Sequence, residues 1–296
     1  MKFNKIGVIG KFGVRNIEST LISLRSILEQ EKLEVLFEDE ISNLYPEQNF
    51  TAADRLYLAE YCDLVIVVGG DGSFLDAARF MAPWKKPMLG INLGRLGFLT
   101  DIAPESMHDS LKAILHGEYK SDVRFVLQCK ILREGKVVGQ GLAMNDVVLH
   151  KWKSARMIEF ETIIDGEFVN TQRADGVIVS TPTGSTAYAL SGGGPILEPS
   201  LEALTLVSIC PHTLSNRPLV VRSDKNIEIV LIDNNSESAQ ITCDGQINMP
   251  GLAGDVIEIT RPDYYVELIH PKKHEVFEVL RAKLGWSDLP KQLKDR

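Results

Sequence analysis

The chain has 296 residues, of which 44% are hydrophobic and 24% are charged, and its formal net charge is −8. This composition is that of a folded globular protein and excludes a disordered chain, a collagen-like repeat or a coiled coil. The negative charge disfavours binding to nucleic acid or to anionic membranes, because polyphosphate surfaces repel an acidic chain. We therefore expect no nucleic acid and no membrane among the partners.

The chain carries no clear targeting, membrane or disulfide signal. Its apolar runs are shorter than the roughly 18 residues that span a bilayer, and the run after Lys5 is too short for a signal peptide. The four cysteines are far apart, which is typical of neither a disulfide framework nor a zinc site. They are Cys62, Cys129, Cys210 and Cys243. We expect a cytoplasmic protein.

The first 120 residues alternate between strand-like and helix-like patterns. Short apolar segments, typical of buried parallel strands, precede segments with apolar residues at helical spacing. The expected strands are 5–10, 33–37, 64–68 and 87–91, and the expected helices are 17–28 and 73–81. A capping box formed by Ser73 and Asp76 places the start of the second helix at Ser73. Residues 1–120 are therefore predicted to form an α/β domain with a Rossmann-like parallel sheet.

The pattern changes near Ser121. From Phe125 to about His270 the segments are β-branched and strand-like, and Glu134-Gly135 and Asp165-Gly166 mark turns between them. Residues 121–270 are predicted to form a β-rich domain, an antiparallel β-sandwich. Helical spacing returns over 273–284, so residues 271–296 are either a terminal helical segment docked on a domain or a frayed tail.

Several common catalytic motifs are missing from the sequence. A P-loop of the form G-x-x-x-x-G-K-[ST] does not occur, and the glycines around Asp71 do not complete the dinucleotide fingerprint. Neither G-x-S-x-G nor H-E-x-x-H occurs, which excludes two large classes of hydrolase.

Gly69-Gly70-Asp71-Gly72 follows a predicted buried strand and opens a helix. Glycines at this place let the backbone approach a phosphate, and the helix N-terminus favours an anion. A carboxylate opposes that field, so Asp71 needs a role, such as accepting a proton, binding a sugar hydroxyl or holding Mg²⁺. The alternative is ordinary Asp-Gly turn chemistry. Because two-residue Asp-Gly turns join strands and this one precedes a helix, we interpret Asp71 as functional.

Three further segments contain candidate binding residues. Asn92 to Leu99 places Gly94 and Gly97 around Arg95, which either pairs with a phosphate or is a solvated arginine. Asn145-Asp146 either pins a turn or binds a ligand's hydroxyls and amides.

The third segment runs from residue 173 to residue 195 and is rich in hydroxyl side chains, with a triple glycine at 192–194. Several short polar groups beside glycines suit the recognition of ribose, amide and phosphate groups. The alternative is a solvated Ser/Thr loop.

Together these motifs resemble the bacterial NAD kinase family. The resemblance extends from about residue 65 to the end of the chain. The segments that carry it are GGDG (69–72), NLGRLGFL (92–99), NDVVLH (145–150), DGVIVSTPTGSTAY (175–188), GGP (193–195), PHTLSNRPLV (211–220) and CDGQ (243–246). It implies phosphorylation of the 2′-hydroxyl of the adenosine ribose of NAD, with ATP as donor and Mg²⁺ or another divalent metal as cofactor.

The same resemblance implies roles for individual residues. Asp71 would be the proton acceptor, with Gly72 beside it, and Phe74 would stack near the adenine. The residues expected to bind the dinucleotide are Asn145, Asp146, Arg156, Arg173, Asp175, Thr186, Ala187, Tyr188, Ala189, Leu190, Ser191 and Gln246. The family also implies a homo-oligomer, tetramer or dimer, whose β-rich domains build part of the NAD site. Its final segment would fold back onto the first domain.

Phosphoryl transfer depends mainly on positioning and on neutralising charge. Because the chain is acidic, the phosphates would need local cations, namely Mg²⁺ and Arg95, Arg156 or Arg173. Two other functions are compatible with parts of the pattern: an NAD(P) sensor without catalysis, and a GGDG-type lipid kinase. The sensor would need neither Asp71 nor a metal, and the lipid kinase would need a basic amphipathic stretch that this chain lacks. A polyphosphate donor in place of ATP, and NADH in place of NAD, stay open.

Overall fold

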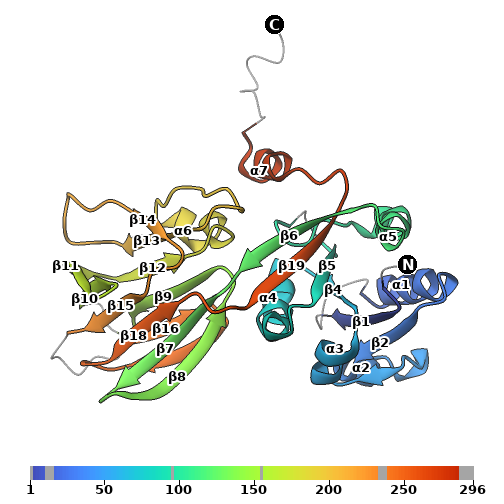
Figure 1. Cartoon of the computed structure of the whole chain (residues 1–296), viewed down its shortest axis with the longest axis horizontal. Helices are drawn as coiled ribbons and strands as arrows, with labels where there is room; N and C mark the ends of the chain where they lie inside the picture. The colour runs from blue at the N-terminus through green and yellow to red at the C-terminus, as the bar shows by residue number, and fades with distance from the viewer. Residues whose placement is uncertain (1–2, 11–16, 95–96, 154–155, 233–238, 287–296) are drawn as a thin grey trace, which may run out of the picture. The chain divides into compact units, whose positions relative to one another are not determined.

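The computed structural model describes residues 3–10, 17–94, 97–153, 156–232 and 239–286 (Figure 1). The chain divides into two compact units. The α/β unit contains Met1–Asp122 and Glu267–Arg296, and the β unit contains Val123–Val266. Among the described residues, no helix combines the length and the apolar character needed to cross a membrane.

A sheet of seven strands within the described residues forms the centre of the α/β unit. Its order is β3-β2-β1-β4-β5-β19-β6, and the pairs from β3 to β19 are parallel. The strands are β1 (Lys5–Gly10), β2 (Glu34–Glu38), β3 (Ala52–Ala53), β4 (Leu64–Gly69), β5 (Pro87–Asn92), β6 (Tyr119–Phe125) and β19 (Tyr265–Pro271). The predicted parallel sheet is thus confirmed, and β19 adds to it a strand from far along the chain.

Helices accompany this sheet, as the alternating pattern predicted. They are α1 (Ile17–Gln30), α2 (Asp39–Leu44), α3 (Arg55–Tyr61), α4 (Asp71–Met81), α5 (Met107–Leu115) and α7 (Val276–Leu284), with short 3₁₀ turns η1 (Pro46–Gln48), η2 (Ala82–Trp84) and η3 (Pro104–Ser106). The sheet and α1 share one core, in which Leu21, Leu24 and Leu28 of the helix are fully buried with Ile66 and Val68 of β4. The apolar spacing of α1 therefore marks the face that covers the sheet.

The start of α4 differs from the prediction. The helix begins at Asp71, directly after β4, and its N-cap is Gly70 in an extended conformation. Ser73 therefore lies inside the first turn, so the predicted capping box is wrong. The Ser73 hydroxyl is buried and has no hydrogen-bond partner in the described part of the chain.

The helix α7 belongs to the α/β unit and buries Val279 and Leu280. Lys283 of α7 also places its Nζ 5.5 Å from the centre of the Phe98 ring. This packing decides between the two alternatives for the last segment: residues 276–284 form a docked helix. Residues 287–296 lie outside the described part of the chain.

The β unit consists of two antiparallel sheets, each with six strands in the described residues. The first has the order β11 (Glu167–Ala174), β10 (Ile158–Ile164), β15 (Ile227–Leu231), β18 (Val256–Thr260), β7 (Leu127–Arg133) and β8 (Lys136–Ala143). The second has the order β14 (Leu219–Arg222), β13 (Ala203–Ile209), β12 (Gly176–Ser180), β9 (Asp146–Lys151), β16 (Ala239–Cys243) and β17 (Ile247–Gly251). Phe160 and Ile257 of the first share one core with Val179 and Ile241 of the second, which confirms the sandwich.

Two-residue turns with positive φ connect several of these strands. Glu134 and Gly135 have φ of 51° and 75°, and Asp165 and Gly166 have φ of 50° and 78°. Positive φ at both central residues is the requirement of a tight hairpin that follows the twist of its strands. Both predicted hairpins are confirmed. Asp244 and Gly245, with φ of 53° and 63°, lie in the three-residue turn between β16 and β17. A short turn η4 (Gly184–Thr186) and α6 (Tyr188–Ser191) follow β12.

Candidate active site

The Asp71 carboxylate joins the glycine loop after β4 to the loop after β5. Its Oδ2 accepts a hydrogen bond from the Phe98 amide at 2.9 Å. Its Oδ1 accepts from the Leu99 amide at 3.1 Å and from the amide and hydroxyl of Thr100 at 3.2 and 3.0 Å. The carboxylate also lies in the first turn of α4, where the helix dipole stabilises a negative charge. We call Gly97–Thr100 the clamp loop.

The clamp loop is shaped by residues that the sequence had marked as a second glycine loop. Asn92 donates from its side-chain amide to the Thr100 carbonyl at 3.0 Å and accepts from the Gly94 amide at 2.7 Å. A Cβ on Gly97 would lie 2.1 Å from Asp71 Oδ1, so only glycine fits there. The loops after β4 and β5 therefore lie side by side. Arg95, the candidate phosphate ligand, lies outside the described residues.

Phe74 does not occupy a position from which it could stack on an adenine. Its side chain has 0% exposure and belongs to the interior of the α/β unit, so the expectation for this residue is wrong. The reason is helical geometry: Phe74 follows Asp71 by three residues and faces the sheet with Leu75 and Ala78. Phe98 in the clamp loop is half-buried and its backbone amide donates to Asp71, and the sequence analysis assigned this residue no role. Gly72 is exposed.

A second group of expected residues lies in the β unit, where β9 begins and β12 and β16 end. The Asp244 carboxylate accepts hydrogen bonds from the amides of Met144 at 3.0 Å, Asn145 at 2.8 Å and Asp146 at 3.2 Å. The Asp244 amide in turn donates to the Asp146 carbonyl at 2.9 Å. Asp244 thus fixes the backbone of the Asn145-Asp146 pair, and Gln246 lies exposed just beyond it in the hairpin.

The segment after β12 packs against the same pair. The Thr181 amide donates to the Asn145 carbonyl at 2.9 Å, and its hydroxyl donates to the Met144 carbonyl at 2.6 Å. A Cβ on Gly184 would lie 2.1 Å from the Asn145 carbonyl oxygen, so the close approach of these two backbone segments also requires glycine. The register of the sheet, which pairs Ser180 with Asp146, brings these residues together.

The hydroxyls of this segment do not all face solvent. Ser180, Thr181, Thr183 and Ser185 are buried. Ser185 donates to the Pro182 carbonyl at 2.6 Å and accepts from the Leu197 amide at 2.9 Å. These hydroxyls therefore stabilise the loop. Thr186 and Ala187 are half-buried, and Tyr188 and Ser191 are exposed, so the second half of the segment holds the accessible positions; Ala189 is buried.

The Asp146 carboxyl is 4% exposed and lies close to Asp244. Burial raises the pKa of Asp146 to about 7, and the negative charge of Asp244 adds to the rise. Near neutral pH this group therefore exchanges between a carboxylate that accepts hydrogen bonds and an acid that donates one.

The remaining expected residues lie at the opposite end of the β9–β12 ladder. Asp175 Oδ1 forms an ion pair with Lys151 Nζ at 2.8 Å, and the next residue, Gly176, is paired with His150 across the two strands. Ser180, which is paired with Asp146, lies four residues along the strand from Gly176, and four residues of a strand span roughly 13 Å. Arg173 is exposed at the end of β11, with its Nε 4.0 Å from Glu159, and Arg156 is also exposed. Within one β unit these residues are thus separated from Asn145 and Asp146.

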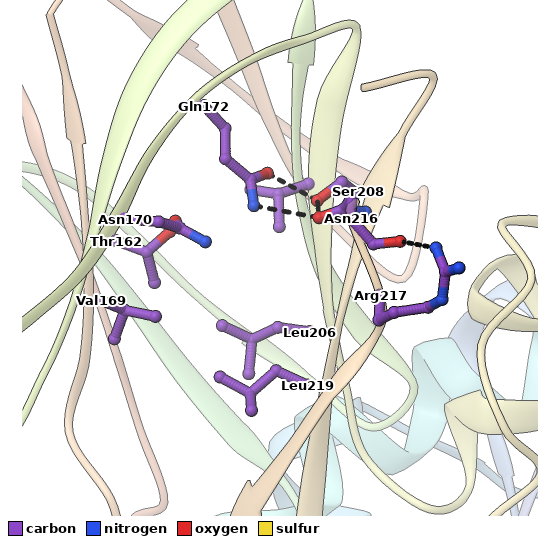
Figure 2. Close-up of a pocket in the computed structure, with 10 residues that line it drawn as sticks. Thr162, Val169, Asn170, Gln172, Leu206, Ser208, Asn216, Arg217 and Leu219 are labelled. Carbon is purple, nitrogen blue, oxygen red and sulfur yellow. Dashed lines mark hydrogen bonds between the residues drawn. The ribbon is translucent and has the colours of Figure 1, made fainter. Parts of the chain in front are cut away.

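Two hollows in the β unit contain none of the expected residues. The first, of about 30 Å³, holds room for about two water molecules (Figure 2). In it Gln172 accepts from the Ser208 hydroxyl at 2.6 Å, and Arg217 donates to the Asn216 carbonyl at 2.7 Å. The second, of about 380 Å³, contains Arg261, which donates to Glu202 and Ser223.

Family models and relatives agree with the sequence motifs. The model of the ATP-NAD kinase N-terminal domain matches residues 6–119, and that of the ATP-NAD kinase C-terminal domain matches residues 144–271. The NAD kinase of Teredinibacter turnerae is 49% identical over 285 residues, which cover 96% of this chain and 97% of that protein. The NAD kinase of Chromohalobacter salexigens is 47% identical with the same coverage.

Two solved structures have similar folds. Yeast NADH kinase complexed with NADH superposes with a TM-score of 0.88 at 23% identity and covers 98% of this chain and 90% of that one. An NAD kinase from Archaeoglobus fulgidus in complex with ATP has a TM-score of 0.72 at 27% identity, covering 95% of this chain and 98% of that one. The first likeness supports the fold of the chain.

The clamp loop gives a prediction about stability. We expect Gly97→Ala to lower the free energy of unfolding by about 1–3 kcal/mol, because its Cβ forces the Asp71 carboxylate off its donors. Gly94→Ala is the matched control, since its Cβ meets only Asn92 Oδ1 at 3.8 Å. Urea unfolding of both variants measures the difference. Equal stability of the two variants would show that Asp71 does not depend on Gly97.

The raised pKa of Asp146 predicts how stability changes with pH. The unfolded chain loses this proton near pH 4, whereas the folded protein keeps it until about pH 7, so stability falls between these values. Asp146→Asn should remove this contribution and be more stable than wild type above about pH 7. Asp109→Asn, which changes a 97% exposed carboxylate, is the control. The free energy of unfolding of each protein is measured between about pH 4 and pH 7. If it changed with pH in the same way in wild type and Asp146→Asn, the raised pKa would not belong to Asp146.

Proposed function

We propose that this chain, which belongs to the NAD kinase family, transfers the γ-phosphoryl group of ATP to the 2′-hydroxyl of the adenosine ribose of NAD, giving NADP and ADP. The observation that carries the proposal is the Asp71 carboxylate, held in the first turn of α4 by four hydrogen bonds from the clamp loop. Ligands of α/β sheets bind at this end of the strands.

Asp71 would orient the ribose hydroxyl and receive its proton as the bond to phosphorus forms. Oδ1 carries three of the four hydrogen bonds and Oδ2 only one. Oδ2 therefore has the greater remaining capacity to accept a hydroxyl proton. Because the transition state of phosphoryl transfer is loose, a carboxylate fixed in position contributes mainly through orientation.

The site offers a carboxylate oxygen that could bind Mg²⁺, and the remaining ligands of the ion would come from the substrate and from water. Mg²⁺ prefers oxygen ligands and usually keeps several waters while binding substrate phosphates. Beside the clamp loop the Asp71 carboxylate is a group of suitable chemistry, and hydrogen bonds from the clamp loop already use most of its capacity. We propose that the phosphates of ATP supply the other ligands, and that the ion neutralises their charge.

The residues at the start of β9 and after β12 would bind the dinucleotide. Asn145 and Asp146 are held by Asp244, and the exposed part of the following segment includes Tyr188 and Ser191. A carboxyl with a pKa of about 7, such as Asp146, can donate to a ring nitrogen or accept from a hydroxyl. Thr186, Ala187 and Gln246 would complete this set.

Arg156, Arg173 and Asp175 lie away from this set within one β unit, so we propose that they act on the dinucleotide bound by a neighbouring copy. This requires a homo-oligomer, a tetramer or a dimer. The exposed Arg173, whose nearest carboxylate partner is 4.0 Å away, is available for a phosphate of the neighbouring ligand.

The reaction predicts a specific effect of Asp71→Asn. We expect NADP formation from NAD, ATP and Mg²⁺ to fall by about 10²-fold or more, because the amide cannot receive the ribose proton. NAD binding measured by calorimetry should stay within a few-fold of wild type. Asp109→Asn, on the exposed surface of α5, should keep full turnover. An Asp71→Asn enzyme with near-native turnover would remove Asp71 from the mechanism, and a wild type that forms no NADP would refute the function.

Mixed oligomers test the proposed sharing of the site. Asp71→Asn and Arg173→Ala proteins should each have low activity alone. Oligomers that combine both kinds of subunit should recover part of it, because some sites receive an intact Asp71 from one copy and an intact Arg173 from another. Activity of co-expressed, separately tagged subunits measures this. No recovery in oligomers shown by mass spectrometry to be mixed would place both residues in the same subunit's site.

A further inference from the structure

The buried Asp101 side chain connects the clamp loop to a strand from the other end of the chain. Asp101 directly follows Thr100, the last residue of the clamp loop. Its side chain is 7% exposed, and its Oδ2 accepts a hydrogen bond from His270 Nδ1 at 2.8 Å. His270 lies near the end of β19, and its own side chain is 2% exposed. This hydrogen bond therefore joins two buried side chains that are 169 residues apart in sequence.

The Asp101 carboxylate is a charged group in the protein interior, where a charge needs a partner. Burial by itself raises the pKa of Asp101, but the contacts with His270 and His274 outweigh burial and the pKa is lowered. His274 also stacks its ring on that of His270, with centroids 3.9 Å apart and planes at 15°. The stacked ring limits the orientations of the His270 imidazole, so the donor to Asp101 is itself fixed.

Further contacts hold the same part of the chain beside the clamp loop. Lys120 of β6 donates from its Nζ to the His274 carbonyl at 2.6 Å, which fixes the turn between β19 and α7. Lys283 of α7 places its Nζ 5.5 Å from the centre of the Phe98 ring, within the range of a cation–π contact. We call residues 267–284 the C-terminal segment. It thus contacts the clamp loop at Phe98 and the residue that follows this loop.

The position of Asp101 in the chain relates this contact to the Asp71 carboxylate. Thr100, on one side of Asp101, gives Asp71 two of its four hydrogen bonds, from its amide and its hydroxyl. Ile102, on the other side, is held to β5, because its carbonyl accepts from the Asn92 amide at 2.8 Å. Without its histidine donor the buried Asp101 carboxylate would lose a charge-assisted hydrogen bond, and its movement toward water would carry Thr100 with it.

We propose that Asp101 is a positioning residue for the phosphoryl transfer. Its hydrogen bond to His270 holds Thr100 in place, and Thr100 in turn holds the Asp71 carboxylate. The catalytic part of this proposal rests on the function proposed above, in which Asp71 orients the ribose hydroxyl. Because a shift of a reacting group by about 1 Å can lower a rate about 10²-fold, the C-terminal segment contributes to turnover through the clamp loop.

Two substitutions of Asp101 in the full-length protein test the proposal. Asp101→Ala removes the acceptor, whereas Asp101→Asn keeps an oxygen that can accept from His270 Nδ1. For NADP formation from NAD, ATP and Mg²⁺, we expect kcat of Asp101→Ala to fall about tenfold or more. The KM values of NAD and ATP should stay within about threefold of wild type, and Asp101→Asn should recover most of kcat. Asp109→Ala, which removes a 97% exposed carboxylate of α5, should keep wild-type kcat.

Amide hydrogen exchange separates positioning from a general loss of stability. In Asp101→Ala the amides of Leu99 and Thr100 should exchange about tenfold or more faster than in wild type, because the loop that holds them opens more often. Exchange in β1 and α1 should not change. This measurement does not use the reaction. A wild type that forms no NADP would therefore refute the proposed function, while exchange would still decide whether Asp101 positions Thr100.

Three results would overturn the proposal: wild-type kcat in Asp101→Ala, unchanged exchange at Leu99 and Thr100, or the same loss of kcat in Asp101→Asn as in Asp101→Ala. Circular dichroism establishes whether each variant is folded. If Asp101→Ala does not fold, His274→Ala, which removes the ring stacked on His270, takes its place. The same fall in kcat and the same faster exchange are expected of it, and wild-type values of both would overturn the proposal.

Discussion

The hydrogen bonds that the Asp71 carboxylate accepts from the clamp loop are the constraint on which the geometry of the candidate site depends. Four donors from three consecutive residues meet on one carboxylate. They hold the loop after β5 against the first turn of α4, and Gly97 lets the loop come this close. A group fixed in this way needs little reorganisation when a ribose hydroxyl binds beside it, so less of the reaction barrier arises from positioning it.

In the β unit a carboxylate also holds a loop by accepting hydrogen bonds from its backbone amides. Asp244 accepts three amides from Met144, Asn145 and Asp146, so one carboxylate again fixes a loop at the end of a strand. Here a second carboxylate, Asp146, is buried beside the first, and its pKa rises to about 7. A carboxyl with this pKa can accept or donate a hydrogen bond near neutral pH, which suits the dinucleotide-binding role that we propose for Asp146. Burying the Asp146 carboxyl lowers the stability of the folded protein above about pH 7, and groups with such strongly shifted pKa values are often found at functional sites.

Much of the fold could be predicted because its signals are local. The β-branched strands of the parallel sheet, the spacing of apolar residues in α1 and the Glu-Gly and Asp-Gly hairpins each depend on a few neighbouring residues. The errors arose where tertiary contacts decide. Ser73 looked like an N-cap, but the helix starts at Asp71, next to the carboxylate's donors in a distant loop.

In the candidate site, too, the features that depend on contacts between distant segments could not be predicted from the sequence. Asp71 could be found because a carboxylate in a glycine loop before a helix is unusual. The burial of Phe74, the inward orientation of the Ser185 hydroxyl and the role of Asp244 as an anchor depend on contacts between segments up to 100 residues apart. The contacts of Asp101 with His270 and His274 are a further case, since 169 residues separate Asp101 from the nearer of the two histidines in sequence. Sequence spacing carries no signal for such groups.

Amide hydrogen exchange at Phe98, Leu99 and Thr100 tests the central claim, that one carboxylate organises the site. Removing its acceptors in Asp71→Ala should speed exchange at these three amides by about tenfold or more, because an amide without its acceptor opens more often. Exchange in β1 and α1 should not change. Equal exchange at the three amides in wild type and Asp71→Ala would show that the loop is held by other contacts, and would contradict the account.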